Sequence, residues 1–419
     1  MFKRLFAVTA LAAAMAAVSG CSDSAAAPPT YDGALHAAAQ ARQASTLATL
    51  EALVNIETGP GDETGMVAMG DYLARQLADL GATVTRHAPE DGSVGENIVG
   101  TFRGTGTRSI LLMAHMDTVY PRGFLQKAPF RVEGNRAYGP GIADDKSGIA
   151  VILNALAILN ARQFNGYGTL TVLFNTDEET GSFGSRELIQ RLAASHDYVL
   201  SHEPALDVAE SFGLATSGIA HAEVVIEGRA SHAGVAPELG VNALTEAADL
   251  ILRTQDIDDK GREIRFNWTL ASAGSASNAI PASATLTADM RYGRNEDYDA
   301  IVAMLDERAQ RKRLPDATVT VNMKRGRPAF NASTEGQALA AKGRAIYEEV
   351  GGTVSIAAAR TGGGSDAAYA ALSGKPVLES MGLPGAGYHT SSDEYILVDA
   401  IPRRLYLETR MIMDLSLGR

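Results

Sequence analysis

The stretch ILLMAHMD, residues 110–117, places five apolar residues directly before a histidine and an aspartate. Two later stretches are similar, LTVLFNTDEE at residues 170–179 and YVLSHE at residues 198–203. Short apolar runs of this kind are typical of strands buried in a parallel sheet, and residues 149–159 between the first two are predicted as a helix. The order strand, helix, strand predicts a layered α/β domain.

The segments on both sides extend this pattern. Residues 35–54 and 66–80 are predicted as helices, and Gly81 ends the second. After residue 327 the pattern returns, with a helix at 337–350, a strand at 374–379 and a closing helix from residue 403. We therefore predict a mixed, largely parallel sheet flanked by helices, formed by residues 31–217 and 328–419.

Residues 218–327 follow a different order. Strands are predicted at 222–226, 266–272, 284–291 and 317–323, and helices at 242–254 and 298–311. This β-α-β-β-α-β order is that of the ferredoxin-like α+β unit. The smaller unit is therefore predicted as a domain inserted into the larger one.

Composition and charge limit the class of protein. The chain has 419 residues, of which 46% are hydrophobic and 21% charged, as in a soluble globular protein. Its net charge is -12, which argues against nucleic acid as a partner, because phosphate binding needs a basic surface. The single cysteine excludes intramolecular disulfides and cysteine-based metal clusters.

The N-terminus predicts export. Lys3 and Arg4 precede an apolar run of 14 residues, Leu5–Val18, which is too short to span a bilayer and is typical of a secretory signal, here residues 1–20. The closing Val-Ser-Gly-Cys resembles a bacterial lipobox, so we expect lipidation of Cys21 and a periplasmic location, with residues 21–30 as a tether. The alternative is an ordinary signal peptide that contains a cysteine. Any membrane contact is expected only through this anchor.

Acids and histidines follow the three strands predicted at residues 110–114, 170–174 and 198–200. In open α/β sheets the carboxyl ends of strands meet at one crevice, so these groups should converge there. Asp144, in a glycine-bounded loop, joins them; the loop lacks the glycine spacing of a nucleotide-binding motif. Crowded carboxylates repel unless cations neutralise them, and imidazole and carboxylate ligands without cysteine suit zinc, manganese or cobalt.

The spacing within two of these motifs suggests individual roles. His115 and Asp117 lie two residues apart on an extended segment, so Asp117 can hold the imidazole nitrogen that does not bind metal. Glu178 and Glu179 are adjacent and should point in different directions in extended backbone. One of them can bind metal while its neighbour remains free as a base.

Several motifs together resemble the di-zinc carboxypeptidase and aminoacylase family, and its glutamate carboxypeptidase (carboxypeptidase G) branch most closely. The resemblance covers about residue 35 to the end. The segments that carry it are AHMDTV at 114–119, GPGIADDK at 139–146, NTDEETGS at 175–182, TSGIA at 216–220, SHAG at 231–234, GRPAF at 326–330, GGGSD at 362–366 and GYHT at 387–390.

The resemblance implies a ligand set and a base. Asp144 would bridge two zinc ions, with His115 and Glu203 completing one site. Glu179 and His389 would complete the other site. Glu178 would be the general base on the metal-bridging water.

The resemblance also implies substrate contacts. His232 of the inserted domain would reach into the partner's active site in a homodimer, for which this domain offers an edge strand and a helix face. Asn278 and Arg291 would grip the α-carboxylate of the substrate, a small peptide or N-acyl amino acid. Arg327 and Gly363 would be further substrate contacts.

One segment departs from the family pattern. The glutamate-specific branch has a lysine that meets the glutamate side chain, whereas residues 206–212 contain no basic residue. Asp207 and Glu210 should weaken attraction for a second carboxylate, and Leu206 and Phe212 should favour an apolar side chain. We expect C-terminal glutamate to be accepted without strong preference.

Two other functions fit part of this pattern. An N-acyl-amino-acid deacylase would use the same metals, since both reactions cleave an amide beside a free carboxylate. A lipid-anchored solute-binding protein would share the lipobox and the two-domain α/β chain, but would not need a metal set with an adjacent free carboxylate.

Overall fold

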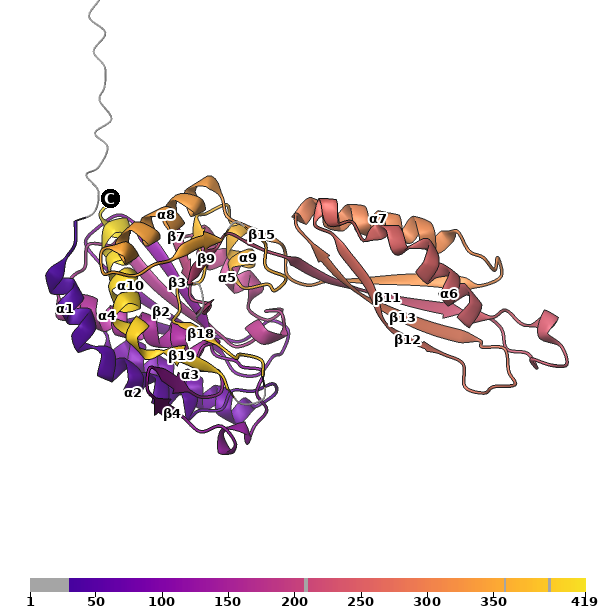
Figure 1. Ribbon diagram of the computed structural model, residues 1–419, viewed down its shortest axis with the longest axis horizontal. Helices are drawn as coiled ribbons and strands as arrows, with labels where there is room; N and C mark the ends of the chain where they lie inside the picture. The colour runs from indigo at the N-terminus through magenta and orange to yellow at the C-terminus, as the bar shows by residue number, and fades with distance from the viewer. Residues whose placement is uncertain (1–29, 207–209, 358, 391–392) are drawn as a thin grey trace, which may run out of the picture.

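The computed structural model describes residues 30–206, 210–357, 359–390 and 393–419. The predicted signal segment, Cys21 and almost all of the predicted tether lie outside these residues. Among the described residues, no helix has both the length and the apolar character needed to cross a membrane. The chain forms a larger unit that contains both ends of the described chain and a smaller unit that extends from it (Figure 1).

A six-stranded sheet lies at the centre of the larger unit, in the order β1-β2-β6-β3-β7-β17. Its strands are β1 Thr83–His87, β2 Asn97–Arg103, β3 Ser109–His115, β6 Thr169–Asn175, β7 Tyr198–Ser201 and β17 Val377–Leu378. β6, β3, β7 and β17 pair in parallel, whereas β1 and β2 at one edge pair antiparallel. The predicted mixed, largely parallel sheet is confirmed.

Helices cover both faces of this sheet. The helices on one face are α1 Gly33–Ala41, α2 Gln43–Val54, α3 Glu63–Asp79, α4 Lys146–Ala161, α8 Thr334–Glu348 and α10 Ile401–Ser416, and those on the other are α5 Arg186–Ala194 and α9 Ala367–Ala371. Leu112 of β3 packs against the face that α4 and α10 cover, whereas Leu111 and Met113 pack against the face that α5 and α9 cover. Successive side chains of a strand point to opposite faces of the sheet. β3 is therefore buried on both faces, which explains its unbroken apolar sequence.

The prediction of a single helix at residues 35–54 is wrong, because two helices occupy this stretch. The chain turns at Arg42, which separates α1 from α2. The Arg42 guanidinium donates to Asn154 Oδ1 on α4, at 3.0 and 3.2 Å. The break lets α1 pack along α10 while α2 packs along α4, so tertiary packing overrides the continuous helical pattern.

The larger unit also contains short strands that the sequence analysis does not predict. A five-stranded sheet has the order β4-β5-β19-β18-β8, with β4 Arg131–Glu133, β5 Arg136–Tyr138, β8 Ala205–Leu206, β18 Pro384–Ala386 and β19 Tyr395–Leu397. Two further pairs form separate two-stranded sheets, β9 Ser211–Gly213 with β16 Ser355–Ala357 and β10 Ala215–Thr216 with β15 Phe330–Asn331. The single-turn 3-10 helices are η1 Phe124–Gln126, η2 Glu178–Thr180, η3 Pro237–Leu239, η4 Gln255–Ile257, η5 Lys260–Arg262 and η6 Val398–Ala400.

The smaller unit has the ferredoxin-like order of elements. In chain order they are β11 Gly218–Glu227, α6 Ala243–Arg253, β12 Arg265–Ala273, β13 Ser283–Tyr292, α7 Asn295–Gln310 and β14 Thr318–Arg325. The strands pair antiparallel in the order β12-β13-β11-β14. The chain enters after β10 and returns before β15, which pair with each other, so this unit is an insertion (Figure 1).

Candidate metal centre

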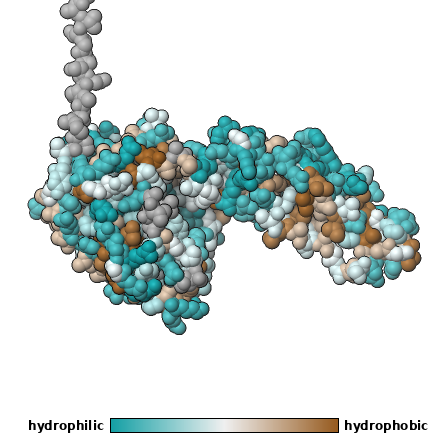
Figure 2. All heavy atoms as spheres, viewed as in Figure 1, coloured by the Kyte–Doolittle hydropathy of each residue, from teal (hydrophilic) through white to brown (hydrophobic). Residues whose placement is uncertain are grey.

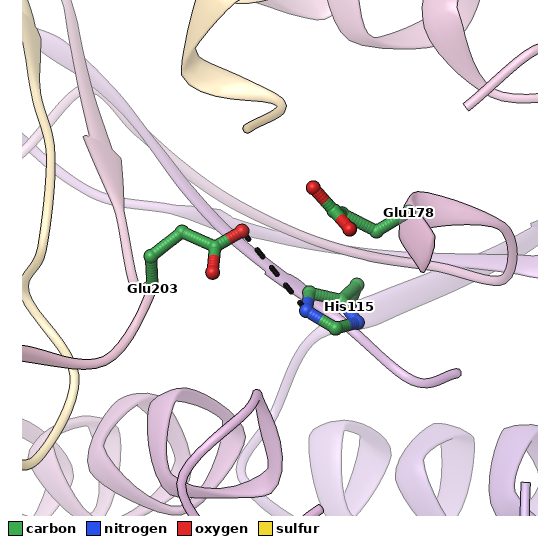
Figure 3. Close-up of side chains that lie close together, drawn as sticks. All are labelled: His115, Glu178 and Glu203. Atoms are coloured by element: carbon green, nitrogen blue, oxygen red, sulfur yellow. Dashed lines mark ion pairs between the residues drawn. The ribbon is translucent and has the colours of Figure 1, made fainter. Parts of the chain in front are cut away.

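His115 ends β3 and lies at the carboxyl edge of the central sheet, buried at 2% exposure. Its Nδ1 lies 3.0 Å from the backbone oxygen of Asp117 and 3.3 Å from Asp117 Oδ1. Its Nε2 faces the opposite way, 3.0 Å from Asp144 Oδ1. This nitrogen also lies 4.0 Å from Glu203 Oε1, the pair that the dashed line marks in Figure 3. One imidazole nitrogen is thus held by the chain, and the other points at two carboxylates.

Asp144 lies between two histidines from distant parts of the chain. Its Oδ1 faces His115, and its Oδ2 lies 3.2 Å from Nε2 of His389. Burial alone would raise the pKa of Asp144, but its hydrogen bonds to the two histidines hold the pKa below its ordinary value. A carboxylate that offers one oxygen to each of two histidines has the geometry of a ligand shared by two cations.

Glu178 and Glu179 follow β6 and form η2, a 3-10 turn in place of the extended backbone that the sequence predicts. The backbone N–H groups of Glu178 and Glu179 donate to Asp117 Oδ1 and Oδ2, at 3.0 and 2.8 Å. Their side chains diverge, because Glu179 lies 3.1 Å from His389 Nε2 and Glu178 Oε1 lies 2.8 Å from Arg327. Asp117 therefore orients both the imidazole of His115 and this turn.

The donor set suits divalent cations. One ligand atom from each of His115, Asp144 and Glu179 lies within 4.8 Å of the others, and the same holds for His115, Glu178 and Glu203. A tetrahedral zinc ion with bonds of about 2.0–2.1 Å separates its ligand atoms by about 3.3 Å, close to the spacings around Asp144. Burial raises the pKa of Glu178 to about 8 against the opposing charges of Arg327 and His115, and raises that of Glu203 well above its usual value. Bound cations would relieve this crowding of buried negative charge.

Arg327 is predicted to be a substrate contact, but the structure commits its guanidinium to the protein. Nη1 contacts Glu178 Oε1 at 2.8 Å and donates to the carbonyl of Gly364 at 3.2 Å. Nη2 donates to the backbone oxygen of Glu178 and to Ser182 Oγ, and it lies 3.8 Å from Asp366. Within the described residues Nε is buried without a partner. The surroundings of Arg327 are therefore those of a residue that positions Glu178.

Arg291 lies at the end of β13 that adjoins the larger unit. Its Nε and Nη2 form a two-pronged pair with Asp289, both at 2.9 Å, and its Nη1 donates to the carbonyl of Gly362 at 3.2 Å. Gly363, the next predicted contact, lies in this exposed glycine loop. Arg291 is one-third exposed, so the remaining N–H groups of its side chain are accessible.

His232 and Asn278 lie together at the other end of the smaller unit. His232 forms a β-bridge with Ala279, and the carbonyl of Asn278 accepts from Ala233 N at 2.9 Å. The stretch of β13 from Ser283 to Arg291 covers about 26 Å at 3.3 Å per residue, so this pair lies far from Arg291. A single chain therefore does not bring Asn278 and Arg291 together, and their grip on one substrate carboxylate stays a prediction.

Two residues of the segment that departs from the family pattern are engaged within the larger unit. The Phe212 side chain has no exposed surface and belongs to the core of the larger unit. Glu210 accepts from Arg404 at 2.6 Å and from Tyr347 at 2.7 Å, so its charge is compensated away from the metal ligands. Asp207 and the side chain of Leu206 lie outside the described part of the structure.

Sequence reasoning also missed one residue of this site. Glu394 is buried and contacts the loop that carries Asp144. No local pattern distinguishes it from an ordinary acidic loop residue.

Comparisons with known proteins agree with this geometry. A sequence model described as peptidase family M20/M25/M40 matches residues 111–414. Carboxypeptidase G2 from Pseudomonas sp. (strain RS-16) is 60% identical over 388 residues, which cover 93% of this chain and 93% of that protein. Succinyl-diaminopimelate desuccinylase from Azoarcus sp. (strain BH72) is 28% identical over 374 residues, 85% of this chain and 94% of the relative.

Solved structures share the fold. Aminopeptidase PepT from Bacillus cereus has a TM-score of 0.74 and 24% identity, with 89% of this chain and 99% of that chain covered. An M20 family metallo-carboxypeptidase from Sulfolobus solfataricus has a TM-score of 0.72 and 15% identity, with the same coverage.

Proposed function

Because the chain belongs to peptidase family M20/M25/M40 and is a metal-dependent hydrolase similar to carboxypeptidase G2, we propose that it is a di-zinc exopeptidase. It would cleave the amide bond that joins a C-terminal amino acid to the rest of a small peptide or acyl conjugate. The observation that carries this proposal is the placement of Asp144, with each carboxylate oxygen facing a different histidine. Family membership excludes the solute-binding alternative.

We propose that five of these side chains form two cation sites. Asp144 would bridge them, with His115 and Glu203 on one side and Glu179 and His389 on the other. When bound, two such cations polarise the scissile carbonyl and lower the pKa of a water molecule.

Glu178 is the residue placed to move the proton. It would accept the proton of the attacking water and deliver it to the leaving nitrogen. Its carboxylate is held by Arg327 rather than by a histidine, which keeps it distinct from its metal-binding neighbour Glu179.

We also propose that the active site is completed by a second copy of the chain. Arg291 lies beside the larger unit of its own chain, whereas His232 and Asn278 lie far from it and would act on the partner. Apolar side chains lie on the smaller unit, with Leu244 and Leu252 on α6 and Leu270 on the edge strand β12 exposed at 51%, 65% and 67%. The hydrophobic surface that gathers there in Figure 2 would form a two-fold contact.

A pocket of about 210 Å³ beside Asp117 and Glu179 favours substrates with an uncharged group before the scissile bond. Its other lining residues include Met66 and Val94. None of its described lining residues is cationic, so an anionic acyl group such as succinyl would meet no cationic side chain there. A neutral N-acyl amino acid fits this pocket as well as a peptide does, so deacylation remains the second candidate.

The basic start, the short apolar run and the lipobox support a further proposal, export to the periplasm with a lipid anchor at Cys21. Metabolic labelling with a radioactive fatty acid should mark the protein. Replacing Cys21 with serine should abolish the label, and a label retained in that variant would contradict the anchor.

The experiment that tests the catalytic proposal combines metal analysis with a substrate panel. Purified protein should hold about two zinc, cobalt or manganese ions per chain and hydrolyse dipeptides and N-benzoyl amino acids faster than N-succinyl ones. The Asp144→Ala variant should lose both ions, because the carboxylate is shared. A folded Asp144→Ala variant with full metal content would contradict the bridging role.

A further inference from the structure

Glu394 lies between His389 and β19 and is buried, with 3% of its surface exposed. Its Oε2 accepts a hydrogen bond from Gly141 N at 2.9 Å. Its Oε1 accepts from Ala143 N at 2.8 Å and from Asp144 N at 3.0 Å. One carboxylate therefore receives three backbone N–H groups from the loop that ends in the bridging aspartate.

The shape of this loop makes these bonds specific. Gly141 has a φ of +69°, and a Cβ there would lie 2.4 Å from the Thr118 methyl carbon, so the turn is tight as well as left-handed. The buried Lys146 holds the other side of the loop by donating to the carbonyl of Pro140 at 3.2 Å. Three N–H groups that converge in such a turn form an anion-binding concavity, and Glu394 fills it.

Glu394 also belongs to the segment that carries the ligand of the other proposed site. It follows His389 by five residues in the sequence, and its own backbone oxygen accepts from Gly139 N at 3.2 Å. The same residue thus ties the start of β19, which follows His389 closely in the sequence, to the Asp144 loop. His389 Nε2 and Asp144 Oδ2, the atoms that must face each other, lie 3.2 Å apart.

We propose that Glu394 is a positioning residue of the metal centre. It sets the Asp144 loop in register with the His389 segment, so that each oxygen of Asp144 meets its own histidine. This inference rests on the proposed metal function.

Glu394→Gln tests it, because the amide has nearly the same shape. If its oxygen keeps Ala143 N and Asp144 N, its NH₂ group must face Gly141 N, which places two donors against each other. Groups that orient metal ligands typically contribute 10- to 100-fold to affinity, so zinc affinity should fall by about that factor. Affinity is measured on metal-free protein by competition with a chelator, with folding followed by circular dichroism.

Glu246→Gln is the matched control. Glu246 is also fully buried and accepts from two loop N–H groups, Arg313 N at 3.3 Å and Leu314 N at 2.7 Å, but in the smaller unit. It should lower stability and leave zinc affinity within about twofold of the wild type, the scatter of ordinary distant substitutions. An equal loss of affinity in Glu246→Gln would show that general destabilisation is responsible.

Glu394→Asp covers the case in which the glutamine variant does not fold. Aspartate keeps the negative charge, so this variant should fold. Its side chain is one methylene shorter, so the variant should bind zinc less tightly than the wild type does. Wild-type zinc affinity in a folded Glu394→Gln or Glu394→Asp protein would overturn the inference. Absence of zinc binding by the wild type would instead overturn the proposed function.

Discussion

Replacing Arg327 with methionine removes the cation that lies 2.8 Å from Glu178 and 3.8 Å from Asp366. All three side chains are less than a tenth exposed, so two carboxylates lose their counter-charge in a poorly solvated region. Breaking a buried ion pair in this way costs about 3–5 kcal/mol. At about 1.36 kcal/mol per pKa unit, this equals roughly two to four units, shared between the two carboxylates.

The direction of the change in activity follows from the proposed role of Glu178 as the general base. Burial raises the pKa of Glu178 and Arg327 lowers it, so removal of Arg327 raises the pKa further. Bound cations lower the pKa of Glu178 but leave the sign of the Arg327 contribution unchanged. Because Glu178 must be ionised to accept a proton, the acidic limb of the kcat/KM profile should move up by about one to two pH units, and activity on that limb should fall by about 10- to 100-fold.

The assay uses two substrates with the same acyl group, one ending in glutamate and the other in leucine. Loss of activity should be equal for both, since the change acts on the base and not on the substrate side chain. Arg360→Met is the matched control, because that partly buried guanidinium donates to the Thr216 carbonyl at 2.7 Å and also pairs with Glu263, and neither partner is a proposed metal ligand. A loss confined to the glutamate substrate, or an acidic limb that does not move, would refute the positioning role of Arg327.

Three further predictions concern the base, the partner subunit and the substrate. Glu178→Gln should keep the metal ions and lose several orders of magnitude in kcat, whereas Glu179→Gln should lose metal ions; elemental analysis and turnover decide, and reversed phenotypes would exchange the two roles. Mixed dimers of Asn278→Ala with Glu178→Gln, or of His232→Ala with Glu178→Gln, should recover part of the activity, and no recovery after verified subunit exchange would count against action in trans. The kcat/KM for C-terminal glutamate should exceed that for leucine by less than about a hundredfold, or roughly 2.7 kcal/mol. Residues 206–212 contain no basic side chain, and the guanidinium of Arg327 is already paired with Glu178. A larger ratio would identify another cation that binds the glutamate side chain.

Local sequence predicted the elements that depend on nearest neighbours in the chain. The run from Ile110 to Ala114 is apolar at every position because β3 is buried on both faces, and the sequence alone therefore indicated a central strand. The spacing of His115 and Asp117 likewise predicted their contact, since residues two apart on an extended segment share a face.

The family resemblance identified a candidate metal ligand that the spacing of residues in the sequence could not. His389 stands in a segment with no metal-binding pattern of its own, and only the family motif drew attention to it. The structure then placed its Nε2 within 3.2 Å of both Asp144 and Glu179.

Only the tertiary structure decided which charges meet across long chain separations. The family resemblance implied that Arg327 contacts the substrate, but the return of the chain from the inserted unit places it on Glu178, 149 residues away. Asn278 and Arg291 are close in sequence, but an extended strand keeps them apart. Glu394 contacts Asp144 across 250 residues, because β18 and β19 bring its segment against the loop. Local spacing fixes only how neighbouring side chains are directed, whereas these pairings depend on the packing of whole elements, which no short window of sequence contains.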